Sequence, residues 1–254
     1  MSIWITGDCH SDVRRFSTDS FYEQKEMSQD KDFVIILGDF GLVWERDEES
    51  YNERYWLNWL EKKPFTVLFI DGNHENHPRL ITYPVKEWNG GKVHEIRPHV
   101  LHLMRGEIYT IENKKFFAFG GASSHDISDG ILDYEDKDWK NKATALERQG
   151  KYMYRIKGLT WWSEELPTEE EMQNGINNLE KHNWKVDYIL SHTPPASVIA
   201  LLGKGLYEQD ILTKYLEEIR SKTDYKRMFS GHMHVDRAVN DKDILLYEQI
   251  VRIV

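Results

Sequence analysis

The stretch TVLFIDGNHE, residues 66–75, decides the fold class, because five strand-forming residues run directly into a group of polar ones. A short continuous apolar run bounded by turn residues predicts a strand buried on both faces, as in parallel sheets. Asn73 and His74 follow that strand at once. In open α/β sheets, ligand-binding groups gather at the carboxyl ends of the strands. The stretch therefore predicts both a sheet strand and a functional site at its end.

Similar apolar runs recur along the chain and alternate with helical patterns, which is typical of a layered α/β protein. The last helical pattern carries apolar residues at a spacing of 3.6, so one face is expected to pack on a sheet. Strands are predicted at Ile3–Thr6, Phe33–Leu37, Thr66–Ile70, Phe116–Phe119, Val186–Leu190 and Arg227–Ser230. Helices are predicted at Asp12–Met27, Glu45–Glu61, Thr168–Lys181 and Glu208–Arg220.

Two regions point to a second sheet. Residues 92–119 contain several short alternating segments without a helical pattern, which indicates antiparallel strands, and the apolar run 244–254 is expected to close that sheet. The predicted architecture is α/β, with two facing mixed β-sheets flanked by helices in an α-β-β-α order. Residues 1–254 are expected to form a single domain, with an insertion at about 123–165 that holds a short helix near 138–148.

The composition excludes several classes of protein. The 254 residues include 33 Lys and Arg against 43 Asp and Glu, a formal net charge of −10, which disfavours a long nucleic acid as partner. No run approaches the roughly 20 apolar residues of a membrane helix, so no membrane partner is expected. The start of the chain shows no targeting pattern, and we expect a cytoplasmic protein. Cys9 stands alone, which excludes an intrachain disulfide and a cysteine-based zinc site.

Potential metal ligands follow five of the predicted strands. If these strand ends converge, they bring together more oxygen and nitrogen donors than the four of a tetrahedral zinc site. The number fits two metal ions about 3.5–4 Å apart that share a carboxylate. The donors are Asp8, His10, Asp39, Asn73, His192, His232 and His234.

The donor types also bear on the metal. Carboxylate, amide and imidazole ligands without sulfur favour Mn²⁺, Fe or Zn²⁺, and of these we expect Mn²⁺, with Fe or Zn²⁺ as alternatives. A water that bridges two such ions loses its proton near neutral pH and can attack phosphorus, while the ions neutralise charge on a phosphoryl group. We therefore expect two divalent metal ions and hydrolysis of a phosphate ester by a bridging hydroxide.

Five sequence blocks, in this order, make the chain resemble the calcineurin-like metallophosphoesterase superfamily: Asp8-Cys9-His10, Gly38-Asp39, Gly72-Asn73-His74-Glu75, Ser191-His192 and Gly231-His232-Met233-His234. The resemblance implies a β-sandwich flanked by helices and a dinuclear metal centre. It also implies a first metal held by Asp8, His10, Asp39 and His234, and a second held by Asp39, Asn73, His192 and His232.

The resemblance assigns His74 and Asn73 as catalytic residues. His74 would donate to a phosphate oxygen and protonate the leaving group, and Asn73 doubles as a ligand. Many members continue the second block as Gly-Asp-x-x-Asp-Arg, whereas this chain has GDFGLV at residues 38–43. The missing arginine favours a nucleotide or another small-molecule phosphodiester or monoester as the substrate, rather than a phosphoprotein. A replacement cation would come from Arg97, Arg105, His125 or Arg155.

Other interpretations stay open at this point. A non-catalytic interaction scaffold would use the same fold, and a nuclease would use the same chemistry. Trp161 and Trp162 fit either a stacking platform for a base or a small core beneath the insertion. Glu75 is expected to support the turn rather than bind metal, and Cys9 to be buried and inert. The oligomeric state does not follow from the sequence.

Overall fold

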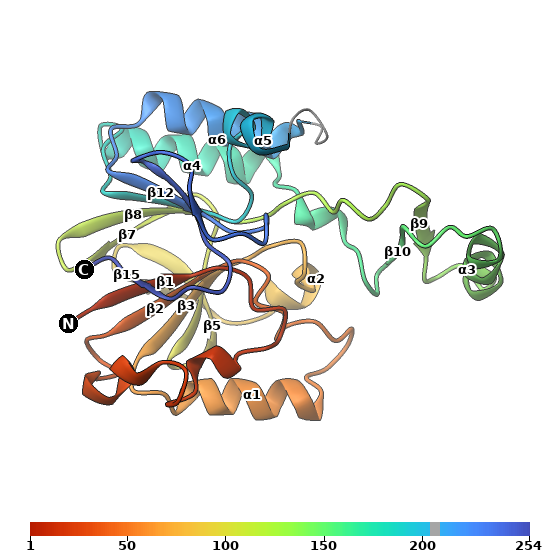
Figure 1. The fold of residues 1–254 in the computed structure, drawn as a ribbon, viewed down its shortest axis with the longest axis horizontal. Helices are drawn as coiled ribbons and strands as arrows, with labels where there is room; N and C mark the ends of the chain where they lie inside the picture. Colours follow the sequence, from red (N-terminus) through yellow and green to blue (C-terminus); the bar gives the residue numbers. More distant parts are fainter. Residues whose placement is uncertain (204–208) are drawn as a thin grey trace.

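The computed structural model describes residues 1–203 and 209–254, and two large β-sheets that face each other dominate it. Helix α1 (Tyr51–Glu61) covers the outer face of one sheet, and helices α4 (Glu169–Lys181) and α6 (Ile211–Lys222) cover the other (Figure 1). The predicted α/β class with two facing mixed sheets and flanking helices is confirmed.

The first sheet has seven strands, and its centre is parallel. β1, β2, β3 and β6 run in the same direction, whereas β15 and β5 are antiparallel to their neighbours. Every residue of β2 and β3 is buried, because both faces of these strands are covered. The strands in spatial order are β15 (Val251–Arg252), β1 (Ile3–Thr6), β2 (Phe33–Leu37), β3 (Thr66–Ile70), β6 (Val100–Leu103), β5 (Gly91–Arg97) and β4 (Val85–Trp88).

The second sheet has six strands, four of them parallel, with antiparallel strands β13 and β7 at its edges. All six strands predicted from the sequence are present, with bounds shifted by at most two residues. The strands in spatial order are β13 (Arg237–Ala238), β14 (Asp243–Leu245), β12 (Arg227–Ser230), β11 (Tyr188–Ser191), β8 (Lys114–Phe119) and β7 (Glu107–Ile111).

The predicted membership of the second sheet was wrong for part of the chain. Within residues 92–119, β5 and β6 belong to the first sheet, and only β7 and β8 belong to the second. Residues 244–254 are divided likewise, between β14 and β15. Alternation of apolar residues indicates that a segment is a strand, but it carries no information on which sheet edge the strand joins.

Three apolar cores hold the layers together. The core between the sheets contains Leu68, Tyr109 and Leu190, which are buried. The core beneath α1 includes Leu57, and the core beneath α4 and α6 includes Leu216. Burial of one such leucine contributes about 2 kcal/mol. The three cores hold both sheets in place, and this in turn fixes the positions of the strand ends where the candidate ligands lie.

The helices begin where a side chain caps them. α1 begins at residue 51 rather than at the predicted 45, because the Ser50 hydroxyl accepts from the Glu53 amide and starts the helix there. α6 begins at residue 211 after the Asp210 cap, and the predicted start at Glu208 lies outside the described residues. α4 confirms the prediction, with Thr168 as its cap.

The predicted helix over residues 12–27 was wrong. Only two short 3-10 helices form there, η1 (Arg14–Phe16) and η2 (Tyr22–Glu26). The amide of Gln24 donates to the carbonyl oxygens of Phe16, Ser17 and Phe21. These side-chain bonds satisfy backbone carbonyls that an α-helix would have used, so a compact loop replaces it.

A segment we call the arm, residues 127–160, extends away from both sheets (Figure 1). It contains the parallel pair β9 (Gly130–Asp133) and β10 (Tyr154–Lys157), joined by α3 (Trp139–Arg148). The insertion at about 123–165 within one domain stays a prediction. No helix in the described part of the chain is long and apolar enough to cross a membrane. The remaining short helices are α2 (His77–Leu80), η3 (Ser163–Glu165) and α5 (Ala196–Gly203).

Candidate metal centre

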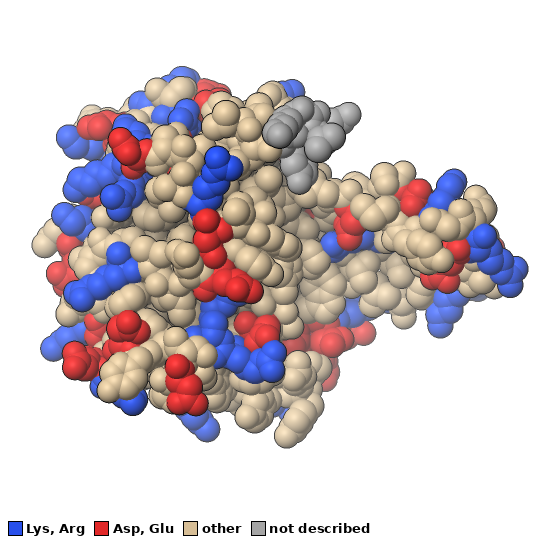
Figure 2. All heavy atoms as spheres, viewed as in Figure 1, with Lys and Arg blue, Asp and Glu red and all other residues tan. Residues whose placement is uncertain are grey.

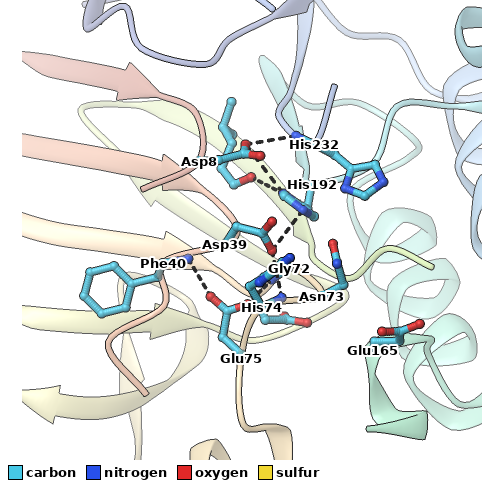
Figure 3. Close-up of polar contacts among 12 residues, drawn as sticks. Asp8, Asp39, Phe40, Gly72, Asn73, His74, Glu75, Glu165, His192 and His232 are labelled. Carbon is cyan, nitrogen blue, oxygen red and sulfur yellow. Dashed lines mark hydrogen bonds and ion pairs between the residues drawn. The ribbon is translucent and has the colours of Figure 1, made fainter. Parts of the chain in front are cut away.

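The predicted ligands come from strand ends of both sheets and lie together (Figure 3). Asp8 follows β1, Asp39 follows β2 and Asn73 follows β3, all in the first sheet. His192 follows β11 and His232 follows β12, in the second sheet. The carboxyl ends of the parallel strands in the two sheets therefore meet at one place, as expected for a ligand site in an α/β fold.

The backbone at this place is strained. A positive φ angle is uncommon for residues other than glycine and costs about 1–2 kcal/mol. Such strain persists where the surrounding contacts over-determine it, and it clusters at functional sites. Four predicted ligands have positive φ angles between 46° and 64°: His10, Asp39, His232 and His234.

The first cluster consists of Asp8, His10, Asp39 and His234, whose potential ligand atoms all lie within 4.8 Å of one another. His234 Nε2 is 3.1 Å from Asp8 Oδ2. His10 Nε2 is 3.0 Å from His234 Nε2 and 3.6 Å from Asp39 Oδ2. Two carboxylates and two imidazoles that converge in this way offer four donors for one cation.

The second cluster consists of Asp39, His192 and His232 and shares Asp39 with the first. His192 Nε2 is 3.2 Å from Asp39 Oδ1, while its Nδ1 donates to the Leu37 carbonyl oxygen at 2.6 Å. That bond orients the imidazole and leaves Nε2 facing the cluster.

Asn73, the oxygen donor predicted for the second cluster, lines the same cavity as Asp39 and His232. Its amide nitrogen donates to Ser124 Oγ at 3.3 Å, whereas its Oδ1 is buried without a hydrogen-bond partner among the described residues. Asp8 Oδ2 is likewise buried and makes no well-aligned hydrogen bond among the described residues; its near neighbour, at 3.1 Å, is Nε2 of His234, itself a candidate ligand. A buried oxygen that lacks a donor costs free energy, so both oxygens fit a cation between them and the imidazoles.

The charges of the site favour a cation. Burial opposes ionisation of Asp39, but the neighbouring His192 holds the pKa of Asp39 well below its usual range. Burial would lower the pKa of His192, yet Asp39 and Asp8 raise it to about 10. Burial and His192 lower the pKa of His232 well below its usual value. The pocket around Asp39 thus attracts positive charge, while His232 offers a neutral imidazole.

A comparison with protein families covers most strands of both sheets and all of the predicted ligands. The family model of the calcineurin-like phosphoesterases matches residues 1–236. This chain belongs to the calcineurin-like phosphoesterase family. Membership makes it a phosphoesterase that depends on divalent metal ions, and the two clusters are candidate sites for them.

Other comparisons add little. A phosphopantetheinyl hydrolase from Mycobacterium tuberculosis is a similar solved structure, at 13% identity and a TM-score of 0.42. The match covers 97% of this chain and 88% of that one. No match is found among curated proteins.

Polar residues outside the predicted ligand set hold the candidate site in shape. Glu75 is buried and accepts hydrogen bonds from the Phe40 amide at 2.6 Å and the Gly72 amide at 2.7 Å. It therefore ties the loop that carries Asp39 to the loop that carries Asn73. Its predicted supporting role agrees with these contacts, because both carboxylate oxygens are occupied by backbone amides.

Sequence reasoning missed Ser124 and Glu165. Glu165 accepts from the Ser124 amide at 2.8 Å and from its hydroxyl at 2.6 Å, and Ser124 in turn accepts from Asn73. This chain of bonds sets the orientation of the Asn73 amide, with the oxygen toward the second cluster. Ser124 follows the predicted strand Phe116–Phe119 but is not a typical metal ligand, and Glu165 follows no predicted strand, so the pattern that revealed the ligands did not single out either residue.

His74 lies beside the clusters. Its backbone amide donates to Asp39 Oδ1 at 2.8 Å, and Trp44 stacks on its ring with a centroid distance of 5.6 Å. Burial, assisted by the Arg155 cation, lowers the pKa of His74 to about 4. Trp162 is buried and packs edge-on against Trp44, in agreement with the small core that was one of the two predicted roles.

The four candidate replacement cations divide into two groups. Arg97 pairs with Glu49, and Arg105 pairs with the buried Asp71, so both are engaged elsewhere. His125 Nε2 lies 2.6 Å from His232 Nε2, and Arg155 Nη2 lies 3.0 Å from His74 Nε2. Only this second pair lies at the site. Cys9 is buried, as predicted, and burial raises the pKa of its thiol to about 12.

Proposed function

We propose that the enzyme hydrolyses a small-molecule phosphate monoester or diester at a centre of two divalent cations. The first cation would be held by Asp8, His10, Asp39 and His234, and the second by Asp39, Asn73, His192 and His232. The observation that supports this assignment is the sharing of Asp39 between the two clusters. Manganese is the proposed metal, since the donors are oxygen and nitrogen without sulfur, and Fe or Zn²⁺ would fit the same donors.

The residues around the centre have separate tasks. Two bound cations would neutralise charge on the phosphoryl group and supply a hydroxide between them as the nucleophile. The negative charge of a bound phosphoryl oxygen would favour the protonated imidazole of His74, which would hydrogen-bond that oxygen and then give its proton to the leaving group. Its fixed backbone bond to Asp39 and its stacking on Trp44 keep the imidazole beside the clusters. Asn73 would present its oxygen to the second cation.

The space and surface around the clusters support a small substrate. A cavity of about 290 Å³ opens beside Asp39 and His74. On the face shown in Figure 2, the described basic and acidic side chains are interspersed, without a basic stripe of the kind that binds long nucleic acid. A nucleotide or another small phosphate ester is therefore proposed over a phosphoprotein. The cytoplasmic location stays a prediction of the sequence.

Hydrolysis of chromogenic phosphate esters tests the proposal. We expect the Mn²⁺-loaded protein to hydrolyse p-nitrophenyl phosphate or its diester. His74→Ala should lower kcat by about 10²–10⁴ while the metal content stays unchanged. His182→Ala is the matched control, because this histidine lies at the end of α4 and bonds to the Asn178 carbonyl oxygen. Absence of turnover with Mn²⁺, Fe²⁺ and Zn²⁺ alike would contradict the proposed function.

A further inference from the structure

The cavity beside the metal clusters contains one strong cation. Among the described residues that line it, Arg155 is the only arginine or lysine. It is 9% exposed, although it belongs to β10 of the arm, which otherwise extends into solvent (Figure 1). A guanidinium in this position needs an explanation, because arginine is rarely so buried without a set of partners.

Two contacts direct the guanidinium. Arg155 Nε donates to Asp126 Oδ1 at 2.6 Å, and Nη1 donates to the Thr160 carbonyl oxygen at 3.0 Å. These two bonds occupy Nε and Nη1, and they leave Nη2 as the nitrogen that is not bound at the base of the arm, where Asp126 also lines the cavity. The Nη2 edge therefore faces the cavity, where it approaches His74 Nε2 at 3.0 Å.

The number of donors leaves capacity for a ligand. A guanidinium carries five N–H groups in a planar fork that matches the oxygens of a phosphate group. Three of them are used by Asp126, Thr160 and His74. Two remain without a hydrogen bond among the described residues. Arg155 and His74 both face the cavity, so an anionic oxygen placed between them would accept from Arg155 Nη2 in place of His74 Nε2, and from His74 once Nε2 carries a proton.

The position of Arg155 also bears on the arginine that is missing from the second sequence block. Residues 38–43 read GDFGLV and provide no arginine beside Asp39. We propose that Arg155, delivered by the arm, binds the phosphoryl oxygens of the substrate, and that Asp126 is a positioning residue for it. This inference rests on the proposed function and adds to it a substrate-binding residue that lies outside the five sequence blocks.

Phosphate affinity provides a direct test. Binding of inorganic phosphate to the Mn²⁺-loaded protein is measured by calorimetry, together with KM and kcat for p-nitrophenyl phosphate. Arg155→Ala should weaken phosphate binding and lower kcat/KM by about 10- to 100-fold, as expected for the loss of one charge-assisted hydrogen bond. Arg155→Lys should recover part of both, because it keeps the charge but not the fork. The metal content and the melting temperature should remain those of the wild type.

Two further variants separate substrate binding from a structural role. Lys157→Ala is the matched control, since Lys157 is an exposed cation two residues further along β10. It should leave phosphate affinity unchanged. Asp126→Asn should weaken phosphate binding less than Arg155→Ala does, because the guanidinium keeps its charge and its bond to Thr160.

A double variant tests whether Arg155 acts only through His74. In a His74→Ala background, Arg155→Ala should weaken phosphate binding by a further 10-fold or more. The inference would be overturned if Arg155→Ala bound phosphate within threefold of the wild type, or if it had no effect in the His74→Ala background. In either case an active wild-type enzyme would leave the proposed function standing. An inactive wild type would instead refute the proposed function and, with it, this inference.

Discussion

Replacement of Glu53 by glutamine should strongly destabilise the protein. Glu53 is 4% exposed, and its Oε1 accepts from the Trp44 amide at 2.7 Å and from Arg79 Nη2 at 2.8 Å. Its Oε2 accepts from the Ser50 amide at 2.8 Å and from Arg79 Nη1 at 3.1 Å. A glutamine has one acceptor oxygen, so its NH₂ group would face donors on one side. Arg79, 8% exposed, would lose its counter-charge.

The expected loss is about 3–5 kcal/mol in the free energy of unfolding, the usual effect of removing one partner from a buried ion pair. That is a large share of a typical total of about 5–15 kcal/mol. Urea denaturation followed by circular dichroism measures it at pH 7. Ser50→Ala removes only the helix cap and should cost about 1 kcal/mol. Glu218→Gln, which breaks an exposed pair with Lys222 on α6, should cost less than about 0.5 kcal/mol.

The pH dependence gives a second check on the same variant. Burial opposes ionisation of Glu53, but the Arg79 hydrogen bonds keep its pKa below the ordinary value of 4.5. The ionised carboxylate therefore contributes stability that is present above pH 4.5 and is lost as the pH falls through the folded pKa. The wild type and Glu53→Gln should converge in stability below that range. A deficit under 1 kcal/mol at pH 7, or one that grows on acidification, would refute this reasoning.

Three other predictions follow from the structure. Asp39→Asn should bind less than one metal ion per chain by elemental analysis, because it weakens both clusters; retention of two ions would contradict the assignment of Asp39 as the shared ligand. Gly72→Ala should reduce metal content and lower the melting temperature, since its Cβ would overlap the Asp39 carboxylate, and an unchanged metal affinity would count against this close approach. Burial lowers the pKa of Lys63 to about 8, so stability should rise between pH 8 and 10.5 as the folded protein releases its proton first. Lys63→Met should stabilise the protein at pH 7 by about 1–2 kcal/mol after loss of the Trp59 contact, an advantage that disappears above pH 10.5 in denaturation curves.

The parts of the fold that could be predicted are those that depend on the pattern of apolar and polar residues within a short segment. The strands at residues 33–37 and 66–70 are almost continuously apolar, because both faces of each strand are covered and every residue is buried. The ligands could be predicted because the carboxyl ends of parallel strands meet. The prediction of a helix at residues 12–27 was wrong, because the Gln24 side chain donates to backbone carbonyl oxygens there. The spacing of apolar residues does not reveal such side-chain bonds.

Contacts between segments that are far apart in the sequence could not be predicted from the pattern of residues within each segment. Whether 91–103 joins the first or second sheet depends on which strand edge is free, which only the assembled layers decide. The Ser124–Glu165 bonds that orient Asn73 join segments 41 residues apart in the chain. Arg155 could be named as a candidate cation but not placed, because its position depends on the path of the arm.

The pairing of β1 with β15 joins two segments that are far apart in the sequence, with Ile5 opposite Val251. Tyr247, shortly before β15, stacks on His234 at a centroid distance of 4.7 Å, and its carbonyl oxygen accepts from Arg15. During synthesis on the ribosome, the strand that leads to Asp8 therefore waits for residues near 250 before it gains its last neighbour. Contacts of such long sequence separation slow folding, so a nascent chain would acquire its metal-binding geometry only after residues near 250 have left the ribosome.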